Sequence, residues 1–383
     1  MRYYTLKLNF PDTDERARVV QNLLDLKEAL DKQVPAKEFN ENLLISTWNI
    51  RDFDSNKFGH GPRLTESLFY LAEIISHYDL VALQEVSQDL GPLGQLMYIL
   101  GEDWDFIATD VTEGKSGNRE RMAFLYDQKR VTFRKIAGEI VLPGEDLLAG
   151  EQQFARTPFT VAFQSGWFRF SLCTVHIYYG ADSGDGLDRR IREIEQIAKF
   201  LAERNEKYNE NMILLGDFNI VSPEHQTMKA LKENGFQVPA KIQEKPTPTN
   251  MFQTKYYDQI AYKEKKGEMR FAEHDNSAGV FNYYDIVFRS NQFPDYRKDL
   301  IETLTRRQRP YREKLERARS EKSKAEHQEA IDKLDALKMD QEALQIYYLE
   351  DWRTFQMSDH LPMWIELRIN FSEDYLKKIQ KPL

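Results

Sequence analysis

An acidic and an amide side chain follow an apolar run near the middle of this chain, with a spacing that suits phosphate or metal chemistry. Asp217 and Asn219 come directly after the run 212–215 and Gly216. In an extended segment their side chains point to the same face, because side chains alternate along a strand. The carboxylate can bind a cation or accept a proton, and the amide can donate to a phosphoryl oxygen. An Asx turn after a buried strand is the structural alternative.

The same placement recurs at the ends of other apolar runs. These positions carry Asn49, Glu85, His176 and the adjacent pair Asp359 and His360. A carboxylate that ends an otherwise apolar strand has to be paired or metal-bound, because an isolated buried charge is costly. We therefore predict that these residues share one site with the 217–219 pair.

Short apolar runs alternate with helical patterns from about Leu43 onward. The runs typical of strands are 43–49, 80–85, 122–126, 168–176 and 212–217. Helical periodicity lies between several of them, at 62–77 and 187–206. This alternation predicts an α/β sandwich, and the polar residues at the strand ends predict loops that converge on one site.

Three further segments flank or interrupt this pattern. Alternation of Tyr4, Leu6, Leu8 and Phe10 predicts a strand over 3–10, followed by an amphipathic helix that Asp12 or Thr13 can cap. The predicted organisation is an N-terminal strand-helix extension 1–42, a catalytic domain 43–296 plus 351–370, a helical insertion 297–350 and a C-terminal tail 371–383.

The insertion combines helical spacing with an unusual charge. Its apolar stripe consists of Ala330, Leu334, Leu337, Leu344 and Tyr348. One long helix or a helical hairpin would explain it, and the stripe needs a partner, either the hairpin itself or a second copy of the chain. Residues 306–324 contain nine Lys and Arg against three Glu, a local charge of +6 inside a chain of 383 residues with net charge −9. The net charge therefore excludes a uniformly basic protein but allows a local basic surface.

The cysteine content and the N-terminus limit the cellular context. The single cysteine, Cys173, excludes an intrachain disulfide framework and a cysteine-based zinc cluster. The first ten residues lack the apolar stretch of a secretory signal, and no run is long and apolar enough for a transmembrane helix. We expect a cytoplasmic protein without a membrane partner; a leader removed from a longer precursor is the alternative.

Seven ordered motifs resemble one known family. They are Trp48-Asn49-Ile50-Arg51, Gln84-Glu85-Val86, Glu120 to Tyr126, Thr174-Val175-His176, Gly216 to Asn219, Tyr257 to Ile260 and Ser358 to Pro362. Together they resemble the endonuclease/exonuclease/phosphatase superfamily, in particular its deoxyribonuclease-like branch, to which pancreatic deoxyribonuclease belongs. The resemblance covers roughly 43–262 and 355–369. It implies a four-layer α/β/β/α sandwich of two mixed sheets, with the helical arm or hairpin inserted.

The resemblance implies a metal site and two imidazole–carboxylate pairs. A catalytic divalent cation, Mg²⁺ or Mn²⁺, is implied at Glu85, Asn49 and Asp359. The two implied pairs are His176 with Glu120 and His360 with Asp258. An acidic partner fixes the tautomer of an imidazole and raises its basicity, which is the physical reason for such pairs.

The remaining positions carried over from the family concern the attacking water and the substrate. Asp217 and Asn219 match the pair that positions or deprotonates water and holds a phosphoryl oxygen. Arg156 and Arg51 match phosphate-contacting positions. Asn118 stands where the deoxyribonuclease branch has a tyrosine that packs on a DNA sugar, so that contact is altered here. Either Asp217 or His360 could be the general base.

These residues predict a metal-dependent phosphodiesterase, and the basic insertion favours nucleic acid, above all DNA, as its partner. The predicted activity is endonucleolytic cleavage of DNA by in-line water attack. A phosphoesterase for a lipid headgroup, an inositol phosphate or RNA is one alternative. An interaction scaffold, dimeric through the helical arm, is another.

Overall fold

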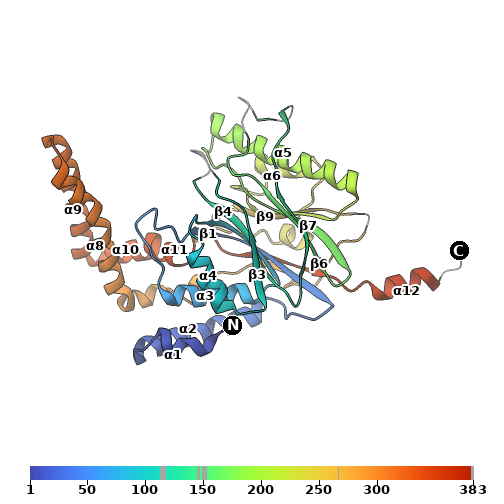
Figure 1. Ribbon diagram of the computed structural model, residues 1–383, viewed down its shortest axis with the longest axis horizontal. Helices are drawn as coiled ribbons and strands as arrows, with labels where there is room; N and C mark the ends of the chain where they lie inside the picture. The colour runs from blue at the N-terminus through green and yellow to red at the C-terminus, as the bar shows by residue number, and fades with distance from the viewer. Residues whose placement is uncertain (113–117, 145–146, 149–152, 266, 381–383) are drawn as a thin grey trace.

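The computed structural model describes residues 1–112, 118–144, 147–148, 153–265 and 267–380. Two β-sheets stack face to face, and helices cover the outer face of each sheet (Figure 1). The first sheet contains β1 (Asn42–Phe53), β2 (Leu80–Val86), β3 (Trp104–Ala108), β4 (Arg121–Asp127), β10 (Arg270–Phe271), β11 (Ala278–Val280) and β12 (Met363–Arg368). The second contains β5 (Thr132–Glu139), β6 (Phe159–Ser165), β7 (Phe168–His176), β8 (Met212–Asp217) and β9 (Asp258–Lys263). This arrangement confirms the predicted four-layer sandwich.

The strand order is β10-β12-β1-β2-β4-β3 in the first sheet, where β11 also pairs with β12, and β5-β6-β7-β8-β9 in the second. The helices are α1 (Leu6–Asn9), α2 (Thr13–Gln33), α3 (Thr65–Ser76), α4 (Gly91–Leu100), α5 (Gly184–Tyr208), α6 (Gln226–Glu233), α7 (Ala240–Glu244), α8 (Phe293–Arg317), α9 (Glu321–Met339), α10 (Gln341–Tyr347), α11 (Arg353–Gln356) and α12 (Ser372–Gln380). In Figure 1, α5 and α6 lie above the two sheets, and α3 and α4 lie below them. No described helix is both long and apolar enough to cross a membrane.

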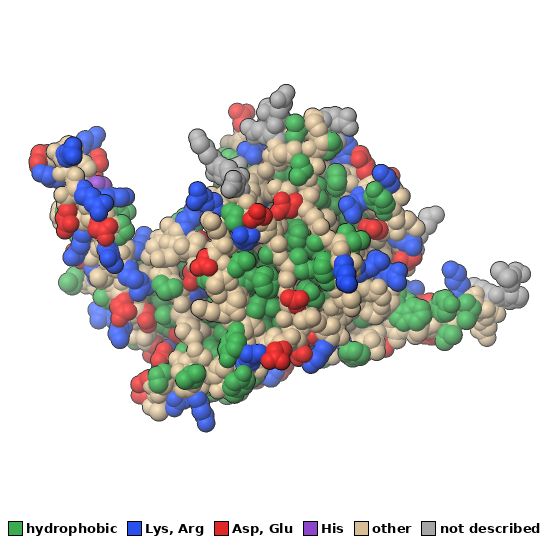
Figure 2. Space-filling model, in the orientation of Figure 1, with side chains coloured by type: hydrophobic (Ala, Val, Ile, Leu, Met, Phe, Trp, Pro, Cys, Tyr) green, Lys and Arg blue, Asp and Glu red, His purple; other side chains and the backbone are tan. Residues whose placement is uncertain are grey.

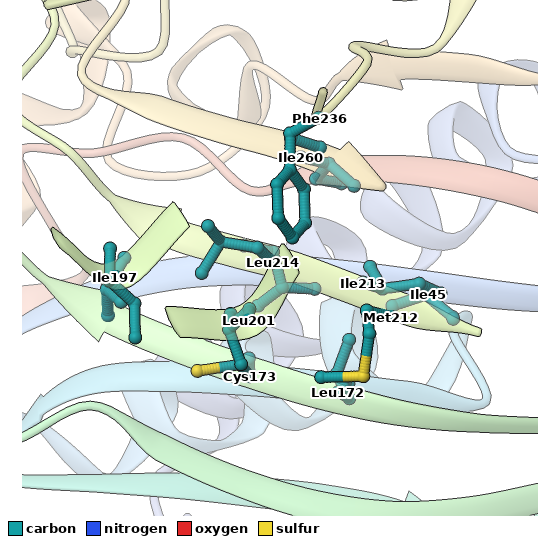
Figure 3. Packing of buried hydrophobic residues seen from close by; sticks show 14 of the residues in the cluster. Ile45, Leu172, Cys173, Ile197, Leu201, Met212, Ile213, Leu214, Phe236 and Ile260 are labelled. Carbon is teal, nitrogen blue, oxygen red and sulfur yellow. The ribbon is translucent and has the colours of Figure 1, made fainter. Parts of the chain in front are cut away.

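Two apolar cores hold the layers together, and the alternation of β1 divides its side chains between them. Leu43 and Ile45 belong to a core that includes both sheets and α5, whereas Leu44 and Trp48 belong to a core shared with α2, α3 and α8. Figure 3 shows part of the first core, with Ile45 of one sheet among residues of the other sheet and of α5. Because successive side chains of a strand face opposite sides, one strand contributes to both cores.

Two parallel strand pairs bring the predicted site residues to the same edge. β1 and β2 run parallel with Asn49 opposite Gln84, and β7 and β8 run parallel with His176 opposite Asp217. Parallel neighbours end at the same edge of a sheet, so the polar residues that follow each apolar run lie together.

The predicted strand over 3–10 is wrong. A 3₁₀ turn, Tyr3–Thr5, leads into α1 instead. Tyr4 and Leu8 are 74% and 84% exposed, so the alternating pattern did not mark a buried face. The helical path instead places Leu6 and Phe10, four residues apart, on one buried side. The helix predicted after them is confirmed, and the Asp12 side chain caps it by accepting from two backbone N–H groups.

The segment 297–350 contains most of a helical hairpin. The chain turns between α8 and α9, the two helices pack on each other, and a side-chain hydrogen bond from buried Gln308 to the Ile331 carbonyl joins them at 3.1 Å. The hairpin stands away from the sandwich at the left of Figure 1, and we call it the arm. Leu344 and Tyr348 of the apolar stripe are buried, and Leu334 and Leu337 are partly buried, within the same chain. The chain itself therefore covers part of the stripe for which the sequence left a hairpin and a second copy open.

Candidate active site

Asn49 links the two sheets at the edge where the predicted residues converge. Its Nδ2 donates to Glu85 Oε1 at 3.0 Å within the first sheet and to Asp217 Oδ2 at 3.1 Å in the second. Asn49 is buried at the end of the parallel part of β1, where its side chain faces the opposite sheet. One amide therefore fixes the distance between two carboxylates from different layers.

Glu85 reaches this site through a local break in strand geometry. The pairing of β2 with β4 shifts register between Leu83 and Val86, and Glu85 adopts a φ of +59°. Regular alternation would place its side chain beside that of Leu83, in the core on the helix side. The bulge re-aims the carboxylate toward Asn49, and Oε2 also accepts the Asp52 backbone N–H at 3.0 Å. Burial, together with the nearby Glu120 carboxylate, raises the pKa of Glu85.

Gly216 allows the second sheet to place His176 beside Asp217. Its φ is +135°, and a Cβ at this position would lie 2.1 Å from the Val175 carbonyl oxygen of β7. A residue with a side chain would therefore push β8 away from β7. With glycine present, His176 Nε2 lies 3.6 Å from Asp217 Oδ2.

Glu120 and Arg156 stand behind His176. The imidazole Nδ1 lies 3.2 Å from Glu120 Oε2, without the alignment of a hydrogen bond, and Arg156 Nε donates to the same oxygen at 2.7 Å. Burial raises the pKa of Glu120, but His176 and Arg156 outweigh it and lower that pKa to about 2. Glu120 is thus a carboxylate at neutral pH whose charge is shared between an imidazole and a guanidinium. The structure brings together the predicted pair and engages Arg156, a predicted phosphate contact, with Glu120.

The second predicted pair, His360 with Asp258, is more tightly coupled. His360 Nδ1 lies 2.7 Å from Asp258 Oδ2, and both side chains are buried. Burial lowers the pKa of His360, but Asp258 and Asp217 raise it well above the ordinary value. His360 Nε2 faces the site at 3.8 Å from Asp217 Oδ2. The same Asp217 oxygen therefore lies between two imidazoles, each with a carboxylate behind it.

The segment from Asp217 to Asn219 forms an Asx turn and also contributes a carboxylate oxygen to the site. The Asn219 backbone N–H donates to Asp217 Oδ1 at 2.8 Å, which is the Asx turn that the sequence offered as the alternative. The turn uses Oδ1 and leaves Oδ2 facing the imidazoles. The Asn219 side chain donates to the Ile177 carbonyl at 2.8 Å, so this donor, which we predicted to hold a phosphoryl oxygen, is engaged within the chain.

The other predicted residues lie toward the rim. Asp359 has a side chain 39% exposed, with Oδ2 3.6 Å from Arg51 Nε. The Arg51 guanidinium also lies 3.9 Å from the centre of the Phe355 ring, and its backbone N–H donates to Asn49 Oδ1. Asn118 is exposed, two residues before Glu120. Arg51 and Asp359 therefore border the site, whereas Asn118 faces solvent.

Comparison with known proteins places this arrangement in a family. The profile of the Endonuclease/Exonuclease/phosphatase family matches residues 46–261, more than half of the chain. The chain belongs to this family. A Bacteroides thetaiotaomicron family protein of known structure is 14% identical, with a TM-score of 0.50 over 86% of this chain and 99% of that one. This likeness supports the shared fold.

Two further solved structures are similar in outline. A mannosyl-6-phosphatase of Bacteroides thetaiotaomicron is 18% identical, with a TM-score of 0.47 over 63% of this chain and 90% of that one. The catalytic domain of human Nocturnin, with a bound sulfate, is 17% identical, with a TM-score of 0.45 over 64% and 87% of the two chains. No curated protein matches the sequence.

Enzymes of this phosphoesterase family generally depend on a divalent metal, and the donor set of this chain fits one. Glu85, Glu120 and His176 each offer a ligand atom, and these atoms lie within 4.8 Å of one another. The family resemblance implied Glu85 with Asn49 and Asp359 instead. Asn49 contacts Glu85 through its amide nitrogen, and Asp359 pairs with Arg51, so Glu85 is the member common to both sets. Burial and the neighbouring carboxylates raise the pKa of Glu85, and a bound cation would oppose this rise.

Sequence reasoning missed Arg190, which positions the Asn219 loop. This fully buried side chain of α5 donates from Nη1 to the Asn219 carbonyl at 3.0 Å and from Nε to the Tyr179 carbonyl at 2.9 Å. Leu187 and Ile194, three residues before it and four after it, are buried apolar residues of the same helix. A charged residue inside an apolar helical stripe was the sequence signal that could have identified it.

Proposed function

We propose that this protein is a divalent-metal-dependent phosphodiesterase that cleaves DNA endonucleolytically. The observation that carries the proposal is the position of Asp217 between His176 and His360, 3.6 and 3.8 Å from their Nε2 atoms. Each imidazole has a carboxylate on its other side. Hydrolysis of a phosphodiester requires a base for the attacking water and a proton donor for the leaving oxygen, and this cluster contains groups for both.

In the proposed reaction, the oxygen of a water molecule forms a bond to phosphorus while the bond from phosphorus to the leaving oxygen breaks. Asp217 takes the proton from water, and His176 gives a proton to the leaving oxygen. His360, held by Asp258, donates to a phosphoryl oxygen as charge develops on it. A divalent cation held at Glu85 would neutralise phosphoryl charge. Asp217 is our choice for the base because, among the residues that the structure describes, it is the carboxylate that lies within 4 Å of both imidazoles.

The arm supports a nucleic-acid substrate. Eight of the nine Lys and Arg side chains in 306–324 are exposed. They are Arg306, Arg309, Arg312, Lys314, Arg317, Arg319, Lys322 and Lys324. Figure 2 shows basic side chains along the arm, interspersed with acidic ones, where it stands away from the sandwich. An exposed excess of positive charge attracts the phosphates of a polymer, whereas a small phosphoester needs only the site itself.

A substrate screen tests the proposal. The protein is incubated with Mg²⁺ or Mn²⁺ and plasmid DNA, RNA, inositol phosphates or a sphingomyelin emulsion. We expect the plasmid to be nicked internally, only with metal, and not by the Asp217→Asn variant, while Asp374→Asn on the exposed surface behaves as wild type. Release of phosphate or headgroup from a small substrate, with intact plasmid, would replace the nuclease by the alternative phosphoesterase.

We also propose that two copies of the chain associate through the arm and that the protein is cytoplasmic. Light scattering on the full chain tests whether two copies associate through the arm, with a monomer as the contradicting result. Fractionation of the native cells tests the cytoplasmic location, which a membrane-bound or exported protein would contradict.

A further inference from the structure

The loop between β1 and α3 connects the catalytic site to the arm. On the side of the site, the loop residue Phe58 contacts Phe355, over whose ring lies Arg51 of β1, the residue that pairs with Asp359. On the side of the arm, Arg306 Nη2 donates to the Gly61 carbonyl at 3.4 Å. The loop also contacts α10, which follows the arm, because His60 Nδ1 lies 3.0 Å from the Tyr347 hydroxyl. The loop therefore lies between the residues that border the site and α8 of the arm.

Phe58 is the large apolar side chain that this loop exposes. It is 52% exposed, although its ring lies 5.7 Å from that of Phe355, centroid to centroid. Phe355 is buried and is itself fixed between Arg51 and His60, whose ring stacks on it at 4.1 Å with an angle of 3°. Phe58 is thus supported from inside by a rigid aromatic group while half of its surface faces solvent.

The charges around Phe58 favour an anionic ligand. Lys57 is exposed, and its Nζ lies 5.3 Å from the centre of the Phe58 ring. The acidic Asp54 is turned inward, where its carboxylate accepts the Arg63 backbone N–H at 2.8 Å. Burial, with Arg307 and Arg51 nearby, lowers the pKa of His60 to about 3, so the imidazole is uncharged at neutral pH. Lys and Arg therefore supply the positive charge around the ring.

We propose that Phe58 is a stacking platform for an unpaired base of a nucleic acid whose phosphodiester occupies the catalytic site. The inference rests on the proposed function and adds a preference for unpaired nucleotides. A base offers a flat π-face for the ring and a phosphate for the adjacent cations, which is how single strands are commonly held. A paired base inside a duplex presents only its edges. A protein partner would need a continuous apolar surface of several hundred Å², whereas this loop exposes one aromatic ring.

Binding measurements with a matched control test the platform. Phe58→Ala is compared with Phe39→Ala, because Phe39 is also exposed, at 66%, with the Arg130 guanidinium 5.9 Å from its ring, and it precedes the opposite end of β1. Fluorescence anisotropy with EDTA gives the dissociation constants for a labelled single-stranded oligonucleotide and for its duplex without hydrolysis. We expect Phe58→Ala to weaken single-strand binding about 5- to 100-fold, with little change for the duplex. Phe39→Ala should change neither, and Phe58→Trp should keep single-strand affinity.

Several outcomes would overturn the platform. Unchanged single-strand affinity in Phe58→Ala, equal weakening for the duplex, or no measurable single-strand binding by the wild type would each do so. Circular dichroism checks the fold, and Phe58→Leu replaces the alanine variant if the latter unfolds. Because binding is measured without metal, a platform effect in a protein that hydrolyses no phosphodiester would refute only the proposed function. Hydrolysis with no effect of Phe58 would refute only the platform.

Discussion

The catalytic edge of the sandwich and the arm use the same charged residue types in opposite surroundings. At the edge, Asp217, Asp258 and His360 are buried, and the His360 imidazole lies within 4 Å of both carboxylates. On the arm, charges are exposed and pair along one helix, as Arg309 does with Glu313 at 3.3 Å. Water screens such pairs, which are individually worth little, whereas a buried charge depends on each neighbour. The edge therefore has the buried, interdependent charges that proton transfer needs, whereas the exposed charges of the arm could act only through a summed, salt-sensitive attraction.

The largest loss of activity is expected for a substitution of Asp217. This substitution is therefore the most severe test of the claim that the buried edge performs the chemistry. Asp217→Asn removes the carboxylate that both imidazoles face, and it keeps the shape of the side chain. We expect kcat for phosphodiester hydrolysis to fall about 10³- to 10⁴-fold, since proton transfer by a positioned group contributes that much at its upper range. Steady-state kinetics measure the loss, and thermal unfolding checks that the fold is kept. A variant with wild-type rates would remove the basis of the mechanism.

Glu85 tests whether a cation sits at the edge. Glu85→Gln removes the charge but not the volume, so we expect at least about 100-fold lower activity at limiting Mg²⁺, with partial recovery when the metal is in excess. A metal titration of both proteins measures this shift. If the activation curve of the variant coincides with that of the wild type, Glu85 does not hold the ion.

The two positioning carboxylates differ and should give different losses. Asp258→Asn removes the charge that holds His360, and we expect about a 10- to 100-fold lower kcat with nearly unchanged KM. Glu120 is shared between His176 and Arg156, so Glu120→Gln also frees a guanidinium and should change the pH profile more than the maximal rate. Rate–pH profiles distinguish the two. Identical profiles for both variants would mean that the pairs are equivalent.

A smaller, salt-dependent effect is expected on the arm. Reversal of Arg312, Arg317 and Arg319 to Glu should weaken DNA binding, and it should reduce the slope of log affinity against log salt by up to about 0.9 for each phosphate that the variant no longer neutralises. Hydrolysis of a short phosphodiester by the same variant should be unchanged. An unaltered salt slope would show that the arm does not bind the phosphate backbone.

The smallest effect is expected on the free energy of unfolding, and it concerns His60 in the loop between β1 and α3. Burial lowers the pKa of His60 to about 3 from an ordinary 6.5, so below pH 6.5 the unfolded chain takes up a proton that the folded protein does not. The free energy of unfolding should therefore fall as the pH decreases from about 6.5 toward 3, and less steeply in His60→Phe. Urea unfolding at several pH values measures it, with His327→Asn on the arm as control. Parallel curves for wild type and His60→Phe would show that His60 does not contribute.

The residue pattern predicted an α/β sandwich with one converged site, and the family resemblance implied its four layers. Neither predicted the local backbone geometry that directs the side chains of the site. Strand ends follow from apolar runs, because the runs reflect burial on both faces. The direction of Glu85 does not, since a bulge reverses it, and a bulge depends on the neighbouring strand rather than on the run itself.

The N-terminal segment and the arm show two ways in which a residue pattern fails to predict structure. Tyr4 and Leu8 alternate without being buried, so their spacing predicted a strand that is a helix. In the arm, helical spacing identified helices but not the turn between them, which Ser320 marks by capping α9 with its side chain. The contacts of Phe58 and Arg190 join segments far apart in the chain and could be found only in three dimensions.

A metal add-back digest tests the central claim most directly. The wild type and Asp217→Asn are freed of metal with EDTA, and supercoiled plasmid is incubated with each protein while Mg²⁺ is restored. The account predicts no cleavage without metal, internal nicking by the wild type once Mg²⁺ returns, and intact plasmid with the variant at every metal concentration. Equal nicking by both proteins would contradict the claim that this converged edge performs the hydrolysis.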